Sequence, residues 1–189
     1  MNARLPDDTA TAANDAPFDI LDAFHRQIQF KLCELRDVAA AIEAGELTPT
    51  LRAQARSVRD WFNSEAREHH LDEERNVFPA LLASGKEELV QQTNRLIQDH
   101  GWLEADWLEI EPSLGAAADG NTWFDPAVLR HAIEIFNELY TDHIVLEESI
   151  AYPEARQRIA PEKWVSMFKE MANRRLVREE QVESRQKAR

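Results

Sequence analysis

The sequence predicts an all-α protein: an up-down-up-down four-helix bundle with an additional short C-terminal helix. The 189 residues contain only 5 glycines, and long stretches of Ala, Leu, Glu, Gln and Arg favour helices over sheets. From residue 17 onward the apolar residues recur at helical spacing, interrupted by short segments that contain Gly, Ser or Pro. Short connections between long helices favour antiparallel neighbours, which predicts the bundle. The interruptions lie at residues 45–49, 84–85, 115–126 and 153–161.

The chain divides into one folded domain and two tails. Residues 1–16 are small and polar, with too little apolar surface to offset the entropy of ordering, so we expect a flexible tail there. The bundle is expected over residues 17–156. Residues 157–178 are expected to form a helix that packs on the bundle, and residues 179–189 to form a charged, frayed tail.

The charge balance argues against some classes of partner. There are 35 Asp and Glu residues against 22 Lys and Arg, so the formal net charge is −13. Nucleic acids and anionic membranes attract clustered Lys and Arg, so we expect neither as a partner, and cations are the more natural ligands. The N-terminal residues lack the basic and then apolar pattern of a secretory leader, and no apolar run reaches ~18 residues. We therefore expect a cytoplasmic protein.

Each of the four predicted bundle helices carries a histidine on an otherwise apolar inner stripe. On the second and the fourth helix a glutamate follows four residues later, ~40° further round and therefore on the same face. Counting residues from one end of the bundle, at ~1.5 Å per residue, places all of these side chains at a similar depth. They are His25, His69, Glu73, His100, His143 and Glu147.

These buried acidic and imidazole groups indicate a metal site. Burying a carboxylate without a partner costs several kcal/mol, so two glutamates in one core need a compensating cation. Imidazole with carboxylate suits iron, manganese or zinc, and carboxylates that can bridge favour a two-metal centre. A cysteine-based zinc or iron–sulfur site is excluded because Cys33 is the only cysteine. The alternative is an unusual polar core without a metal.

The same residues resemble the hemerythrin-like, or HHE cation-binding, domain family over roughly residues 18–155. The family pattern is a lone His on helix one, His-x-x-x-Glu on helix two, a His on helix three and His-x-x-x-Glu on helix four. The matching segments here are His25, HHLDEERNVFPAL from His69, QDHGWLE around His100 and HIVLEESIAYP from His143.

The resemblance implies a non-haem di-iron centre, bridged by Glu73 and Glu147, with His25, His69, His100 and His143 as terminal ligands. One departure matters. Oxygen-carrying hemerythrins place a further histidine four residues before the ligand of helix three, and this chain has Leu96 there. One metal then has fewer imidazoles, which leaves a coordination site for water, a small ligand or Glu104.

Other candidate residues have simpler interpretations. Glu104 lies ~40° round the helix from His100, so it is either a metal ligand or a solvated charge. We expect His70 and Glu74 to form an exposed helix-face pair, because the neighbouring His69 already takes the inward direction. His131 is expected at the surface, and Cys33 is expected to be a small buried side chain.

The sequence favours a binding or sensing protein over an enzyme. We expect a di-iron protein that binds, senses or scavenges O₂ or a related small oxidant, with a diatomic molecule or a peroxide as its ligand. One alternative is a ferroxidase or peroxide-consuming di-iron enzyme, although ferritin-like sites use Glu-x-x-His and no core motif here has that order. The other is a helical interaction module that the metal staples. The sequence leaves open whether the protein forms a homodimer.

Overall fold

The computed structural model describes the chain from residue 16 to residue 187, and this stretch is helical with no strand among its residues. The expected tail at residues 1–16 lies outside the described residues apart from Ala16, which begins the first helix. The prediction of an all-α protein is confirmed. In chain order the elements are α2 (Ala16–Glu43), α3 (Pro49–Trp61), η1 (Phe62–Ala66), α4 (Arg67–Asn76), α5 (Phe78–Leu82), α6 (Glu87–Ala118), α7 (Pro126–Leu146), η2 (Glu147–Ala151), α8 (Tyr152–Arg158) and α9 (Pro161–Lys187).

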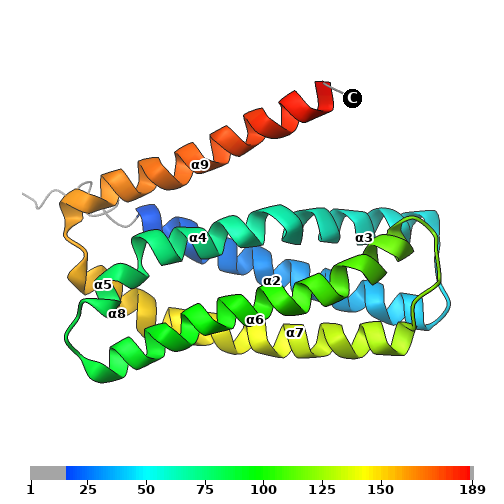
Figure 1. Cartoon of the computed structure of the whole chain (residues 1–189), viewed down its shortest axis with the longest axis horizontal. Coiled ribbons are helices and arrows are strands. Elements are labelled where there is room, and N and C mark those ends of the chain that lie inside the picture. The colour runs from blue at the N-terminus through cyan, green and yellow to red at the C-terminus, as the bar shows by residue number, and fades with distance from the viewer. Residues whose placement is uncertain (1–15, 188–189) are drawn as a thin grey trace, which may run out of the picture.

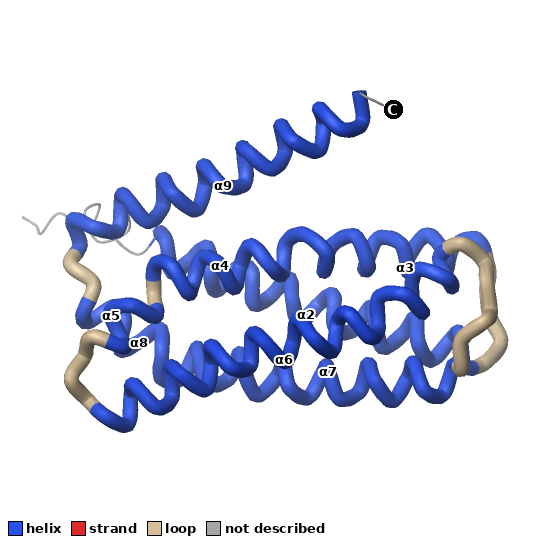
Figure 2. Tube along the Cα trace, in the orientation of Figure 1, coloured by secondary structure: helices blue, strands red, loops and turns tan. Residues whose placement is uncertain are grey.

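The long helices α2, α3, α6 and α7 lie side by side, and α4 continues the course of α3 (Figure 1). Helix α2 packs against both α3 and α7, and α6 packs against the same two helices. Helices α2 and α6 therefore occupy opposite corners, and the inner faces of all of them meet in one interior. Loops at the two ends of the assembly connect successive helices (Figure 2).

Two of these helices pass through a π-helical turn. The turn η1 joins α3 to α4 without a break, and η2 joins α7 to α8. A π turn inserts an extra residue, so it rotates the helix that follows relative to the helix that precedes it. The turn η1 ends directly before the helix that carries His69 and Glu73, and η2 begins at Glu147 itself. Both turns thus adjoin the motifs that the sequence singled out.

The helix ends follow from local chemistry. The side chains of Thr48 and Asp125 accept backbone N–H groups in the first turns of α3 and α7, and a proline follows each as the first helical residue. Gly120, with φ of +82°, follows the C-terminal end of α6. The interruption expected at 115–126 therefore starts only after Ala118, because Gly115 remains helical.

Two hydrophobic clusters fill the interior, and the buried histidines and glutamates lie between them. On α2, Leu21 belongs to one cluster and Ile28 to the other, with His25 between them. On α6, apolar side chains of the same two clusters flank His100. The similar depth that residue counting predicted is what this layering produces.

The C-terminal helix is longer than expected. Helix α9 continues to Lys187, beyond the expected end at residue 178. Its last turns consist mainly of Glu, Gln, Arg and Lys, which are good helix formers, and no Gly or Pro ends it earlier. Met167 and Met171 are buried, while the far end of α9 leads away from the other helices (Figure 1). Among the described residues, no helix combines the length and the apolar character needed to cross a membrane.

Candidate metal centre

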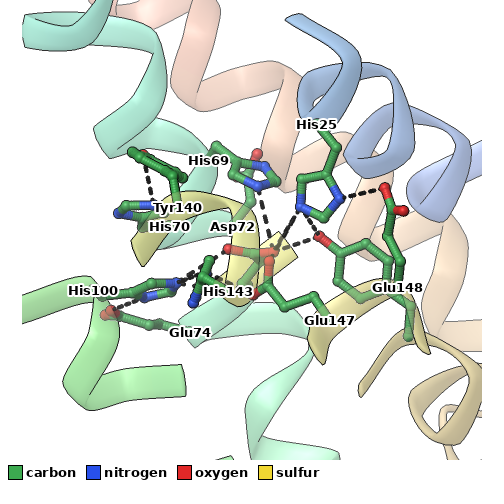
Figure 3. A network of polar contacts seen from close by, with 12 residues as sticks. His25, His69, His70, Asp72, Glu74, His100, Tyr140, His143, Glu147 and Glu148 are labelled. Atoms are coloured by element: carbon green, nitrogen blue, oxygen red, sulfur yellow. Dashed lines mark hydrogen bonds and ion pairs between the residues drawn. The ribbon is translucent and has the colours of Figure 1, made fainter. Parts of the chain in front are cut away.

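The structure brings together the side chains that the sequence predicted as one set, and each is 5% exposed or less. They come from α2, from α4, from α6 and from the junction of α7 with η2, so four separate helical segments contribute (Figure 3). The set consists of His25, His69, Glu73, His100, His143 and Glu147.

The candidate ligand atoms form two clusters that share both glutamates. Cluster A consists of His25, His69, Glu73 and Glu147, and cluster B consists of His100, His143 and the same two glutamates. Within each cluster, one ligand atom per residue lies within 4.8 Å of all the others.

Each glutamate directs its two oxygens at different clusters. Glu73 Oε1 lies 3.4 Å from His69 Nε2, and Glu73 Oε2 lies 3.4 Å from His100 Nε2. Glu147 Oε2 lies 3.1 Å from His25 Nε2, and Glu147 Oε1 lies 3.2 Å from His143 Nε2. Two atoms that bind one ion at right angles, each at about 2.1 Å, are about 3.0 Å apart. These spacings suit two ions bridged by two carboxylates.

Several polar atoms at this centre have no hydrogen-bond partner among the described residues. They include both ring nitrogens of His69, Glu73 Oε2 and Glu147 Oε1. A buried carboxylate oxygen or ring nitrogen without a partner costs free energy, so native cores rarely keep several of them together. The orphaned atoms and the mixed imidazole and carboxylate donors therefore fit bound metal cations.

The pKa shifts show how strongly these groups interact. Burial, and then the neighbouring Glu147, raise the pKa of Glu73 to about 7. Burial alone would raise the pKa of Glu147, but His143 and His25 together outweigh burial and hold that pKa well below its usual value. Burial opposes protonation of His143, yet the Glu147 carboxylate, together with Asp99 and Glu73, raises its pKa to about 10. Without a cation, protons on the imidazoles compensate the carboxylates, and a metal ion would replace those protons.

A second set of carboxylates faces the far nitrogen of three of the histidines. His25 Nδ1 lies 3.0 Å from Glu148 Oε1, and His100 Nδ1 lies 2.8 Å from Glu74 Oε1. His143 Nδ1 also faces a carboxylate, Asp99 Oδ2, but at 3.8 Å the two atoms are beyond hydrogen-bond distance. A carboxylate on the remaining ring nitrogen is the usual partner of a metal-binding histidine, because it fixes the tautomer and the ring orientation.

The sequence analysis missed Glu148, Asp99 and the role of Glu74. A signal for them was present, because each is the chain neighbour of a predicted ligand: Glu148 follows Glu147, Glu74 follows Glu73 and Asp99 precedes His100.

Tyr152 completes the wall beside cluster A. Its hydroxyl donates a hydrogen bond to Glu73 Oε1 and lies 3.1 Å from His25 Nε2. Its ring stacks on the His25 ring, with 5.2 Å between centroids and 10° between planes. The sequence analysis assigned no role to this residue, yet it contacts two of the candidate ligands.

Helix α9 reaches the same region through a charged contact. Asp72, which is fully buried beside Glu73, pairs with Arg174 and Arg175. The Arg175 guanidinium also lies 4.5 Å from the ring centroid of Phe24, and that ring stacks on His69 with 5.7 Å between centroids. The C-terminal helix thus supports α4 from outside.

The expectation that His70 and Glu74 form an exposed pair is wrong. The His70 ring stacks on His100, with 4.0 Å between centroids and 10° between planes, and its Nε2 lies 3.0 Å from the Tyr140 hydroxyl (Figure 3). A helix in a bundle packs against more than one neighbour, so its buried face is wider than a single stripe. His69 faces α2, and His70 faces α6 and α7.

The remaining candidates lie outside both clusters. The Glu104 carboxylate is more than half exposed and lies 3.5 Å from Arg67, so the structure places it among the surface charges. His131 is exposed, as expected, and lies 3.9 Å from Glu134. Cys33, expected to be buried, is exposed, because it lies one position past the buried Leu32 on α2.

A pocket of about 350 Å³ leads from the surface to cluster B between η1, α4 and α6. Its inner end is formed by His70, His100 and Tyr140. Phe62 and Trp107 are among its apolar walls, and charged side chains contribute to its lining as well. A small molecule could approach the centre along this route without unfolding of the core.

Comparison with known proteins agrees with this arrangement. Residues 16–155 match the family model described as the hemerythrin HHE cation binding domain, so the resemblance based on the four motifs is confirmed. The chain is also similar to an uncharacterized protein of Haemophilus influenzae. The two are 25% identical over 163 residues, which cover 86% of this chain and 92% of that protein.

Proposed function

This chain belongs to the hemerythrin HHE cation-binding domain family, and on that premise we propose that it is a di-iron protein that binds, senses or scavenges O₂ or a related small oxidant. In this proposal the helices form an up-down-up-down four-helix bundle, and the two irons are held in clusters A and B. Manganese and zinc suit the same donors and are the competing metals.

One observation carries the proposal: Glu73 and Glu147 each direct one oxygen toward cluster A and the other toward cluster B. A single-metal site needs no such division of both carboxylates. A polar core without metal would leave the buried orphan atoms unexplained.

The described residues would prepare this centre in three ways. Glu148 and Glu74 hold the His25 and His100 imidazoles in position through their outer nitrogens, and Asp99 faces the outer nitrogen of His143. The two hydrophobic clusters exclude water above and below the polar layer, which strengthens electrostatic interactions inside it. The pocket at His70 and His100 provides the approach for a small ligand. Bound iron would supply redox chemistry with a coordination position open to such a ligand.

Metal analysis tests the proposal. We expect protein purified without chelator to contain two irons per chain, and His69→Ala and His143→Ala to lose metal together with the iron-dependent absorption. His131→Ala is the matched control, because His131 is exposed and far from both clusters by its contacts. Stoichiometric zinc with no iron, or metal content unchanged in both variants, would contradict the proposal.

Optical titration separates the roles. If the protein binds or senses a small oxidant, the iron-dependent absorption should respond to O₂, nitric oxide or peroxide at stoichiometric amounts. Sustained consumption of peroxide or Fe²⁺, abolished in Glu73→Ala, would instead support the enzyme that the sequence analysis kept as an alternative. No spectral response to any of these ligands would overturn the proposed role.

A further inference from the structure

His70 lies at cluster B without having been part of the predicted ligand set. Its ring is stacked on the His100 ring at 4.0 Å between centroids, and it lies 5.9 Å from the His143 ring at an angle of 69°. One ring nitrogen from each of His70, His100 and His143 lies within 4.8 Å of the other two. No other histidine outside the predicted set is placed in this way, because His131 is exposed on α7.

These nitrogen positions are close to what one ion requires. Nitrogens bound to a single ion at about 2.1 Å are about 3.0 Å apart at right angles and about 4.2 Å apart when opposite. His100 Nε2 and His143 Nε2 are 3.2 Å apart, as for two adjacent ligands. The nitrogens of His70, His100 and His143 are at most 4.8 Å apart. To reach the spacing of about 3.0 Å for adjacent ligands, the His70 nitrogen would move by less than about 2 Å, a distance within the range of a side-chain rotation.

Tyr140 holds the His70 ring in this place. Its buried hydroxyl lies 3.0 Å from His70 Nε2, and its own ring is 5.7 Å from the imidazole. A hydrogen bond of this kind to a histidine orients the ring for coordination. His70 also forms part of the inner end of the pocket, between the outside and cluster B.

We propose that His70 supplies a third imidazole to the ion at cluster B. The inference rests on the proposed two-metal centre and adds an asymmetry to it. Cluster A would then bind its ion through the imidazoles of His25 and His69, and cluster B through those of His70, His100 and His143. The absence of a histidine at Leu96 on α6 is compensated by the chain neighbour of His69 on α4.

Counting coordinated imidazoles tests this directly. The chain contains 6 histidines, and nitrogen NMR of ¹⁵N-histidine-labelled protein loaded with Zn²⁺ distinguishes metal-bound rings from free rings. We expect five rings to shift on addition of Zn²⁺ and one, assigned through His131→Gln, to stay unchanged. The signal that disappears in His70→Gln identifies the His70 ring. If only four rings shift and the His70 ring is not among them, the inference is overturned and the proposed centre stays intact. A count of zero overturns both.

A chelator competition gives a second readout. We expect His70→Gln to release one of two Zn²⁺ ions at about a tenfold lower chelator concentration than the wild type, with the other ion unaffected. His131→Gln should match the wild type. Equal release of both ions from His70→Gln and the wild type would overturn the inference. Should His70→Gln fail to fold, a wild-type count of five shifted rings by itself supports the inference, because only His131 then stays free.

Discussion

The charged contact between α4 and α9 predicts an unequal response to removal of its two sides. Asp72 is fully buried, whereas the side chains of Arg174 and Arg175 are 14% and 19% exposed. Replacing both arginines by alanine leaves a carboxylate buried with no cation. Replacing Asp72 by alanine leaves two guanidinium groups that are each partly exposed to water, and Arg174 keeps Glu170 as a partner.

The expected magnitudes follow from this difference in burial. Removing one side of a buried ion pair costs about 3–5 kcal/mol, so Arg174→Ala/Arg175→Ala should lower the melting temperature by roughly 6–20 °C. Asp72→Ala loses hydrogen bonds to charged groups, for about 1–3 kcal/mol. Adding Asp72→Ala to the double arginine variant should therefore raise its stability, because it removes the orphaned charge. In the double arginine variant the loss of stability cannot exceed the free energy of undocking α9, because undocking would let water reach Asp72.

Calorimetry on metal-free protein in excess chelator measures these stabilities without a contribution from the metal centre. Amide hydrogen exchange in residues 161–176 then shows whether α9 undocks before the bundle melts. The reasoning is refuted if the triple variant melts below the double arginine variant, or if Asp72→Ala costs as much as the loss of both arginines.

Three further predictions concern the metal centre. A free metal concentration of about 100 times the dissociation constant should raise the free energy of unfolding by about 2.7 kcal/mol. A thermal melt measures this as a higher melting temperature, which excess chelator should lower again; a melting temperature that does not change with metal would contradict the prediction. Because the pKa of Glu73 is raised to about 7, its carboxyl group must lose a proton to bind metal below that pH. The affinity for metal should thus fall on acidification by up to about tenfold per pH unit for each proton released. Titration calorimetry in two buffers of different ionisation enthalpy counts the protons released on metal binding, and a count of zero would refute the prediction. Tyr152→Phe removes the hydrogen bond donated to Glu73, so the pH midpoint of metal binding should move upward, and a downward shift would contradict this assignment.

Helical periodicity was the first basis of the predicted ligand set, and the reason is physical. A stripe with a period of 3.6 residues reports which face of a helix is buried, and a charged or imidazole group on that stripe must meet a partner in the interior. His25 and His100 each lie between apolar residues of the two hydrophobic clusters, so their burial followed from their neighbours in sequence.

The same periodicity could not assign the residues next to the ligands. Glu74 and Glu148 are each ~100° round the helix from a ligand, which a single stripe places in solvent. In the bundle, each helix contacts two others, so these side chains lie at the boundary with a neighbouring helix and reach its histidine. Pairing across helices is set by tertiary structure, and so are the two π turns, for which the sequence analysis gave no signal.

The outer carboxylates connect each candidate bridging glutamate to a histidine on a different helix. Each candidate bridge, Glu73 or Glu147, is followed in the chain by a glutamate that holds a histidine of a different helix. Glu73 and Glu74 lie on α4, and Glu74 holds His100 of α6; Glu147 and Glu148 lie on η2, and Glu148 holds His25 of α2. Loss of helical geometry in either segment would displace a bridge and a distant imidazole together. The centre and the packing of the four helical segments should therefore be lost in one cooperative step, and metal binding should stabilise the whole bundle rather than one helix pair.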